Sequence, residues 1–394
     1  MLKKNLVLFR IYYFFWRFKP LATLMVIYFF HIMQSYTLAM AVFSVFNISY
    51  AIMKVPSGMI SDKIGRKSVI ITANLLLLTA FALLALAGEI NARWLLFAFA
   101  IFWGISEALA SGTLEALIFE TSQSLGYEDK FYKIYSKSMV FDQAGCAFGA
   151  FWAMAVTYFL PLQVLAWLSV FPPLMQFILS MFFIEPKARK KNFCISFDDF
   201  VQTFKQFKNN KKLSFYALAD IYFSTLGDIS HRLESAYFKS FVSDWIISLA
   251  RMIKHFFGML GFAIVSYLKK FHNTEVYFSS ITSNVSVRII ALIFNNAGTP
   301  FIHSIINFFY ATALTAKEDI LQHEFLPQYR AATQSVIQFI KGIYMAGLMF
   351  VLGFISDICG IYFVMCMLVV LRVLGLVAAY YVKKGITQKK CLTK

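Results

Sequence analysis

The sequence predicts an all-α polytopic membrane protein, with about 12 transmembrane helices in two pseudo-symmetric six-helix bundles. Its 394 residues are 59% hydrophobic and only 14% charged, whereas soluble domains are roughly 25% charged. A membrane-spanning helix needs about 20 mostly apolar residues, and the near-continuous apolar runs provide about twelve such helices with short loops. The longest polar segment, residues 185–212, falls near the middle of the chain. It therefore separates two sets of six helices.

The expected spans follow the apolar runs in order. They are residues 20–37, 39–60, 68–88, 94–116, 138–159, 162–184, 213–233, 243–267, 275–296, 299–320, 330–356 and 361–382. The division predicts an N-terminal bundle over residues 1–186, a basic linker over 187–212 and a C-terminal bundle over 213–394. Within the linker, Phe residues recur at nearly helical spacing, which is typical of an amphipathic helix on a membrane surface. A disordered connector is an equal alternative.

Basic residues alternate between successive loops. The formal charge of +17 would suggest nucleic acid in a soluble protein, but here Lys and Arg lie in short segments between apolar runs, so no nucleic-acid partner is expected. The loops after the second, fourth and eighth spans and the C-terminal tail are basic, whereas the intervening loops hold almost no basic residue. Because Lys and Arg concentrate in cytoplasmic loops, both termini are expected to be cytoplasmic. The N-terminal tail supplies Lys3, Lys4, Arg10, Arg17 and Lys19.

A short echo relates the two halves. The sequence of residues 58–65, Gly-Met-Ile-Ser-Asp-Lys-Ile-Gly, is matched by Gly-Phe-Ile-Ser-Asp-Ile-Cys-Gly at residues 353–360. Both segments lie at a predicted helix end. The match supports internal duplication, with chance similarity as the alternative.

The turn after the second span combines glycines, a carboxylate and a basic cluster. Gly58 and Gly65 permit close helix approach and a tight turn, and Asp62 can accept hydrogen bonds from Arg66 or from backbone amides at a helix start. Followed by Lys67, this Gly-x-x-x-Asp-x-x-Gly-Arg-Lys pattern resembles the loop between helices 2 and 3 of the major facilitator superfamily of secondary transporters.

The resemblance implies a specific role for this turn. Asp62 would contact the start of helix 11, near Arg330, and act as a latch between the halves in one conformation. The alternative is an ordinary charged hairpin that follows the positive-inside rule.

Two further stretches extend the resemblance. Residues 111–120 contain a Ser-Gly-x-x-Glu-Ala-Leu-x-x-acidic signature that is similar to one in a bacterial branch of the superfamily, and residues 327–335 resemble the turn that opens helix 11 there. Lys54 stands where that branch usually has Glu. The fourth span has no Arg, so the Arg-containing motif linked with proton coupling in drug antiporters is absent. The resemblance implies a protein of the bacterial inner (plasma) membrane.

Ionisable residues inside apolar spans are costly, so each is a candidate for a substrate or proton pathway. On the fourth span, Glu107 and Glu115 are eight residues apart with Ser111 between them, which places all three on one helical face. A carboxylate on this face could accept and release a proton if the face lines a cavity. For Glu115 a cytoplasmic interface is the alternative.

The other candidates are scattered along the chain. Asp142, Asp220, Arg251 and Lys341 are charged residues within spans, and such charges can instead pair with one another. The polar candidates lie on helices that line the central cavity in the superfamily, although a lone His is more often a packing group. They are His31, Gln34, His303 and Asn307.

The expected function is movement of a small organic solute by alternating access, coupled to a proton or ion gradient, with efflux favoured over uptake by analogy. No P-loop is present, so direct driving by ATP is not indicated. The sequence gives no indication of an enzyme, a cofactor or a metal site. Expected partners are the solute, protons and the lipid bilayer, with the protein as a monomer. The alternatives are a lipid or amphiphile translocase and a non-transporting scaffold or sensor.

Overall fold

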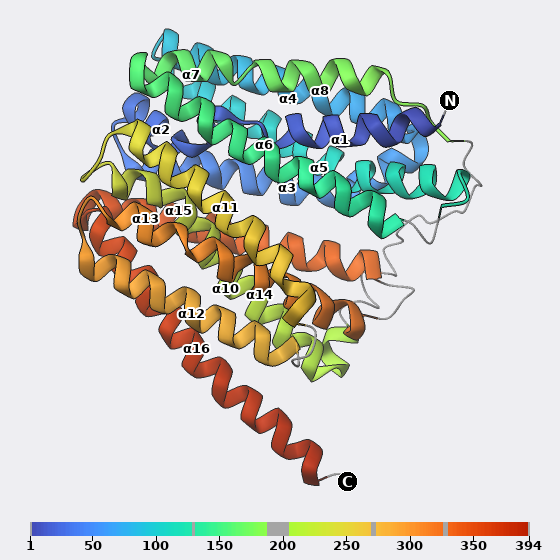
Figure 1. Cartoon of the computed structure of the whole chain (residues 1–394), viewed down its shortest axis with the longest axis vertical. Helices are drawn as coiled ribbons and strands as arrows, with labels where there is room; N and C mark the ends of the chain where they lie inside the picture. The colour runs from blue at the N-terminus through green and yellow to red at the C-terminus, as the bar shows by residue number, and fades with distance from the viewer. Residues whose placement is uncertain (1, 128–130, 187–204, 269–272, 326–329, 393–394) are drawn as a thin grey trace. The chain divides into compact units, whose positions relative to one another are not determined.

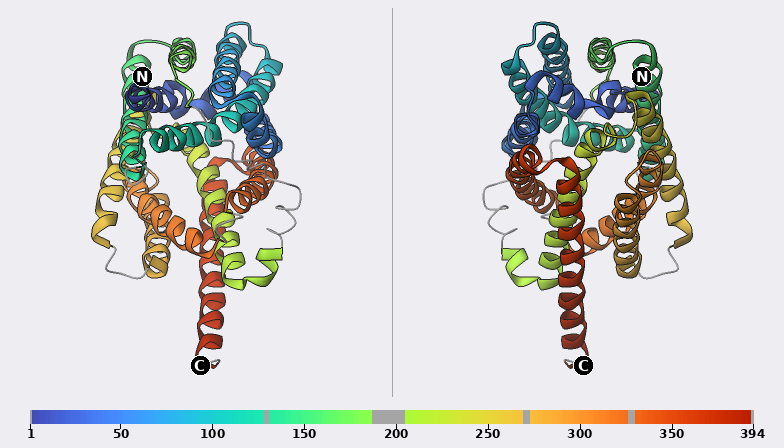
Figure 2. Two further views of the ribbon diagram at one scale, coloured as in Figure 1. Left: turned by 90° about the vertical axis from the view of Figure 1, so that its right-hand side faces the viewer. Right: turned by 90° about the vertical axis from the view of Figure 1, so that its left-hand side faces the viewer.

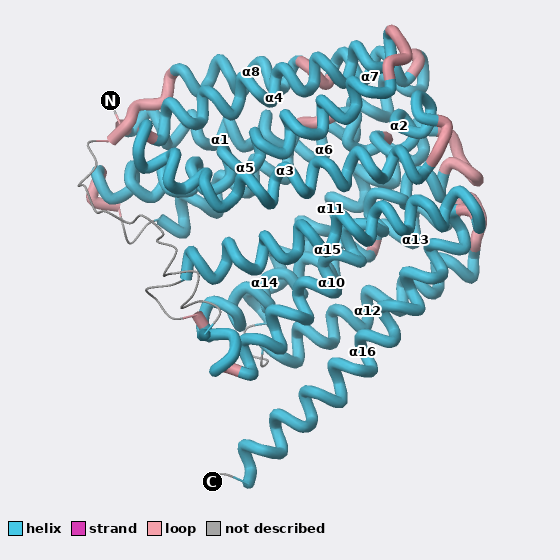
Figure 3. The backbone as a smooth tube through the Cα atoms, turned by 180° about the vertical axis from the view of Figure 1, so that it is seen from behind, coloured by secondary structure: helices cyan, strands magenta, loops and turns pink. Residues whose placement is uncertain are grey.

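The structure, a computed structural model, describes residues 2–127, 131–186, 205–268, 273–325 and 330–392. All regular secondary structure in these residues is helical (Figures 1 and 3). The chain forms two compact units. Unit 1 comprises Met1–Ile195, Ser243–Met252 and Met345–Phe354, and unit 2 comprises Ser196–Val242, Ile253–Tyr344 and Ile355–Lys394. The expected polytopic helical fold is confirmed.

Unit 1 is built on a central long helix, α5, along which α3 and α4 both pack. Helix α8 packs against α4 and α1, and α1 packs along α6. Aromatic and aliphatic side chains from α1, α4 and α5 form a shared buried core that includes Phe9, Tyr12 and Leu114. The elements are α1 (Lys3–Arg17), η1 (Pro20–Thr23), α2 (Met25–Met33), α3 (Tyr36–Ile64), α4 (Arg66–Glu89), α5 (Arg93–Ser124), α6 (Phe131–Phe159), α7 (Leu162–Leu168) and α8 (Phe171–Met181).

In unit 2, α12 runs along α14, and α10 packs against both α16 and α14 (Figure 2). Its core includes Tyr216, Tyr277 and Ile320. Helices α11 and α15 each contribute a short segment to unit 1 and the remainder to unit 2. The elements are α10 (Lys211–Phe238), α11 (Asp244–Leu268), α12 (Asn273–Phe294), α13 (Thr299–Ser304), α14 (Ile306–Glu324), α15 (Arg330–Cys359) and α16 (Ile361–Leu392).

The first helix differs from its expected span. Residues 20–37 were expected to cross the membrane after a basic tail, but helix already begins at Lys3 and continues, with a break at residues 18–24, to Met33. Arg17 and Lys19 are therefore not tail residues: they lie at this break and pair with carboxylates of α5 and α6. The prediction was wrong because hydropathy treats a charge as a loop signal, whereas a carboxylate from another helix can hold it inside a bundle.

Nine helical runs in the described residues are long and apolar enough to cross a membrane. The three expected spans missing from this set are the first, seventh and tenth. The first and tenth are broken, into α1, η1 and α2 and into α13 and α14. The seventh, α10, is continuous over 28 residues but carries Asp220, Asp228, Arg232 and Glu234. Several of the buried charges described below lie on these helices, among them Asp220, Glu234 and Lys317.

The two echoed segments have the same local geometry. Gly65 ends α3 with φ of 99°, and Gly360 follows α15 with φ of 83°. The N–H group of Gly65 donates to the carbonyl of Ser61 at 3.1 Å, and that of Gly360 donates to Ser356 at 3.0 Å. Positive φ is readily available only to glycine, which explains why both echoes end in this residue.

Glycines also set the contact between α1 and α6. A Cβ atom added to Gly145 would lie 2.2 Å from the carbonyl oxygen of Phe14, and one added to Gly149 would lie 3.4 Å from the backbone nitrogen of Lys19. The small residues of 145–149 thus allow α6 to approach the break in the first helix closely.

The predicted linker helix falls mostly at residues 187–204, which lie outside the described residues.

Candidate functional site: buried charges in the two units

In unit 1, the break between α1 and α2 brings two cations against two carboxylates. Arg17 donates from Nε to Oδ1 of Asp142 on α6 at 2.8 Å, and Asp142 is only 5% exposed. Lys19 Nζ lies 3.5 Å from Oε2 of Glu107 on α5. The indole N–H of Trp16 donates to Oε1 of Glu107 at 3.0 Å. Glu107 and Asp142 are thus both held by residues of the first helix.

The broken helix explains why Lys19 can reach Glu107. Lys19 has an extended backbone between α1 and η1, with φ of −123° and ψ of 85°. Its Nζ also lies 5.5 Å from the ring centroid of Trp103 on α5, within the range of a cation–π contact. Such interrupted helices are the usual place for irregular backbone and charge inside membrane transporters.

Glu107 and Ser111 on the predicted polar face of α5 have different partners. Glu107 faces the first helix, whereas the hydroxyl of Ser111 accepts a hydrogen bond from Lys54 of α3 at 2.6 Å. Lys54 also lies 5.6 Å from the ring centroid of Tyr50. Glu115 is exposed. Lys54, which departs from the superfamily pattern, therefore connects α3 to the centre of this face.

The predicted latch residues form a network within unit 1. Arg66 lies 2.6 Å from Asp62 and 3.2 Å from Glu120 on α5. The backbone N–H of Arg66 donates to the Glu185 carboxylate at 2.6 Å, next to Gly65. The expected pairing of Asp62 with Arg66 is confirmed. Lys67 lies in the first turn of α4. Arg330 is the first residue of α15, and its side chain is not among those that the structure describes. The latch contact between Asp62 and the start of α15 therefore stays a prediction.

His31 and Gln34 lie together at the exposed end of α2. Gln34 adopts the left-handed conformation with φ of 57°, and its amide donates to the carbonyl of His31 at 2.6 Å. This side chain thus satisfies one of the free carbonyls at the helix end. The two residues act as a helix terminus in the structure.

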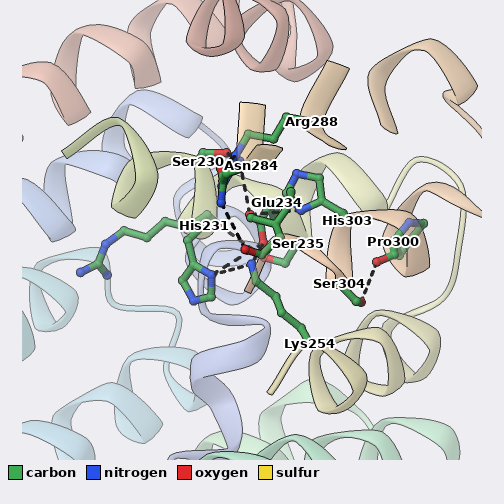
Figure 4. A network of polar contacts seen from close by, with 12 residues as sticks. Ser230, His231, Glu234, Ser235, Lys254, Asn284, Arg288, Pro300, His303 and Ser304 are labelled. Atoms are coloured by element: carbon green, nitrogen blue, oxygen red, sulfur yellow. Dashed lines mark hydrogen bonds and ion pairs between the residues drawn. The ribbon is translucent and has the colours of Figure 1, made fainter. Parts of the chain in front are cut away.

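Unit 2 contains a carboxylate surrounded by basic side chains from four helices (Figure 4). Glu234 of α10 is fully buried. Its Oε2 accepts a hydrogen bond from Lys254 of α11 at 2.6 Å. Arg288 of α12 lies 3.7 Å from Oε1 and the ring of His303 of α13 lies 3.3 Å from it. His231, one turn earlier on α10, lies 3.6 Å from Oε2.

Neutral polar groups also hold Arg288 and its neighbour Arg372. Nε of Arg288 donates to Oδ1 of Asn284 at 3.0 Å, and its Nη1 donates to the hydroxyl of Ser230. Arg372 of α16 donates to the same Asn284 oxygen at 3.1 Å. Arg288 and Arg372 are 5% and 4% exposed. Both guanidinium groups are therefore buried inside the unit.

The remaining charged candidates are paired within unit 2. Lys317 of α14 lies 3.2 Å from Asp220 and 2.9 Å from Glu318. Lys341 of α15 lies 2.8 Å from Asp228 of α10. Buried charges are expected to pair in this way, because an isolated charge is strongly disfavoured in an apolar interior.

Two candidates remain. Arg251 is on α11 and is 4% exposed. Asn307, at the start of α14, packs against Gly258 of α11, where an added Cβ would lie 2.5 Å from the Asn307 amide nitrogen. Asn307 therefore contributes to helix packing in unit 2.

Sequence reasoning missed the centre of the unit 2 cluster. It selected His303 but omitted Glu234, which falls just past the expected end of the seventh span at residue 233. It also read Arg17 and Lys19 as topology signals. The available signal was the density of charge on α10, where Asp228, Arg232 and Glu234 recur every few residues within one continuous helix.

Comparison with known proteins supports the fold. Residues 13–188 match the model of the family described as sugar (and other) transporter. No curated protein matches the chain by sequence.

Solved structures match over nearly the whole chain. The nucleoside transporter NupG is 14% identical with a TM-score of 0.77, covering 95% of this chain and 98% of that one. A POT family transporter in complex with 5-aminolevulinic acid is 12% identical with a TM-score of 0.78, covering 98% and 97%. A D-xylose–proton symporter is 11% identical with a TM-score of 0.73, covering 96% of each chain. These proteins are transporters rather than enzymes, and the chain has their fold.

Proposed function

We propose that this protein is a secondary transporter that moves a small organic solute across the membrane by alternating access of its two units. The observation that carries the proposal is the partly buried carboxylate Glu107, which contacts Lys19 and Trp16 at the break in the first helix of a transporter fold. Ionisable groups at a broken helix inside an apolar bundle serve binding and ion coupling in secondary transporters. The match of residues 13–188 to a transporter family supports the same assignment.

Glu107 is the proposed coupling carboxylate. Its side chain is 23% exposed and therefore more accessible than that of Asp142, which is 7% exposed. When Glu107 takes up a proton, its attraction for Lys19 is lost, and Lys19 is released to another partner or to a different position of the helix break. If Glu107 takes up the proton from one side of the membrane and releases it to the other, the proton gradient would be coupled to the movement of Lys19 and the helix break.

The proposed location is the bacterial inner membrane with both termini cytoplasmic, in line with the distribution of Lys and Arg among the loops. The turn that contains Asp62 and Arg66 is then cytoplasmic. The efflux direction expected from the resemblance stays a prediction, and so does the monomeric state.

The test is solute flux with the purified chain in liposomes. The panel holds nucleosides, pentoses, hexoses, short peptides and organic anions, and flux is measured in both directions with and without a pH gradient. For a solute that moves, we expect Glu107→Gln to abolish accumulation driven by the pH gradient while exchange at equal pH continues. Glu275→Gln, at an exposed carboxylate in the first turn of α12, is the matched control and should behave as the native protein.

Two results would contradict the proposal. A folded chain that moves no member of the panel in either direction would favour a non-transporting scaffold. Unchanged gradient-driven accumulation in Glu107→Gln would exclude this residue as the coupling carboxylate.

A further inference from the structure

Positive charge exceeds negative charge around Glu234. Lys254, Arg288 and Arg372 are each at most 5% exposed, and the Glu234 carboxylate lies 2.6 Å from Lys254 and 3.7 Å from Arg288. The next carboxylate along α10, Asp228, is held by Lys341 at 2.8 Å. Lys254 and Arg288 both contact the Glu234 carboxylate, whereas Arg372 donates to neutral oxygens.

The excess of positive over negative charge is clearest at Arg372. Its Nη1 donates to the neutral Asn284 oxygen at 3.1 Å and its Nη2 to the carbonyl of Phe223 at 3.4 Å. Its buried Nε has no hydrogen-bond partner among the described residues. The Asn284 oxygen also accepts from Arg288 at 3.0 Å, so two guanidinium groups meet at one neutral acceptor. A buried guanidinium is strongly stabilised by an anion and poorly by an amide.

We propose that this cluster binds the carboxylate or phosphate group of an organic anion, and that Glu234 occupies its place when the anion is absent. The inference rests on the transport function proposed above and assigns its substrate class. Guanidinium groups offer paired N–H donors that match carboxylate and phosphate oxygens, and the Lys254 ammonium adds a point charge. His231 is the most exposed member, with a side chain 51% exposed and in contact with Lys254 at 3.1 Å.

The bound anion and the ionised Glu234 compete for the same cations. His231 approaches Glu234 from its own helix, Lys254 from α11, Arg288 from α12 and His303 from α13. Replacing Glu234 by Gln keeps a hydrogen-bond acceptor of the same shape for Lys254 but removes the competing charge. Anion binding should therefore strengthen in Glu234→Gln. A cluster that serves only to hold the helices together predicts no such gain.

The experiment follows thermal unfolding of the full chain in detergent at constant ionic strength. Sodium phosphate or sodium acetate replaces part of the sodium chloride. We expect a saturable rise in the unfolding midpoint with at least one of the two anions. The apparent Kd should fall by about tenfold in Glu234→Gln and rise by about tenfold in Arg372→Gln, because one charge-assisted hydrogen bond contributes roughly that factor. Arg372→Lys should fall between, and Arg93→Gln, at an exposed arginine, is the matched control.

The outcomes separate this inference from the transport function. If neither anion gives a saturable rise in native protein or in Glu234→Gln, the anion site is excluded, even when neutral solutes are transported. If an anion stabilises the protein with these shifts and no solute of the panel moves, the site stands and transport fails. If Arg372→Gln does not fold, the test can still be made with Glu234→Gln, because the proposal predicts tighter anion binding in that variant.

Discussion

Arg17 donates from Nε to Oδ1 of Asp142 at 2.8 Å, joining residues 125 positions apart in the chain. The bond ties the end of α1 to α6 at the point where the first helix breaks. Glu107 and Lys19 form a parallel pair beside it. The two pairs make this break a charged junction within unit 1.

The Arg17–Asp142 pair should show strong coupling in stability. Asp142→Asn leaves Arg17 without its carboxylate, so we expect a lower unfolding midpoint, whereas adding Arg17→Gln to Asp142→Asn should recover part of the loss. The coupling free energy of such contacting pairs is ~0.5–3 kcal/mol. A double-mutant cycle of thermal unfolding in detergent measures it, and strict additivity of the two single changes would contradict the pairing.

Gly145→Ala should be among the most damaging small substitutions in unit 1. Its Cβ would lie 2.2 Å from the Phe14 carbonyl oxygen and 3.0 Å from the carbonyl carbon. Because both are backbone atoms, α1 and α6 would have to separate, at a cost of roughly 1–3 kcal/mol or more. Gly347→Ala is the control, since an added Cβ there meets nothing within 4 Å. Equal unfolding midpoints for the two variants would contradict the close helix approach.

The two helix-ending glycines should differ in their tolerance of alanine. Both have positive φ, 99° at Gly65 and 83° at Gly360, so each substitution carries backbone strain of ~1–3 kcal/mol. At Gly65 the new Cβ would also lie 2.8 Å from the Glu185 carboxylate, whereas at Gly360 it meets nothing within 4 Å. We expect Gly65→Ala to lower the unfolding midpoint more than Gly360→Ala. The opposite order would show that the Glu185 carboxylate moves away freely.

Asp62→Asn should slow transport strongly while leaving membrane insertion intact. The change removes the partner that lies 2.6 Å from Arg66 in the turn between α3 and α4, and with it the proposed latch to the start of α15. Flux in liposomes together with the amount of protein in the membrane measures both effects. Lys63→Gln, at the neighbouring exposed position, is the control. Full flux in Asp62→Asn would remove the latch hypothesis.

Hydropathy predicted most of the helical order. Every expected span after the first overlaps an observed helix or helix pair, and the boundaries differ mainly by extension into the loops, as in α3 (Tyr36–Ile64) against 39–60. This agreement is expected because an apolar run of about 20 residues has few alternatives to a membrane helix. The glycine and Ser-Asp pattern of the echo likewise fixed two helix ends, since positive φ selects glycine locally.

Tertiary structure decided which charged residues belong to loops and which pair with other helices of the bundle. Arg17 and Lys19 look like a basic tail in the sequence, but in the structure they pair with Asp142 and Glu107, which are more than eighty residues away in the chain. Glu234 gains its importance in the same way, from Lys254, Arg288 and His303 on three other helices. The free energy of a buried charge depends on its partners in space, so apolar runs set the helices, and packing of those helices decides the site.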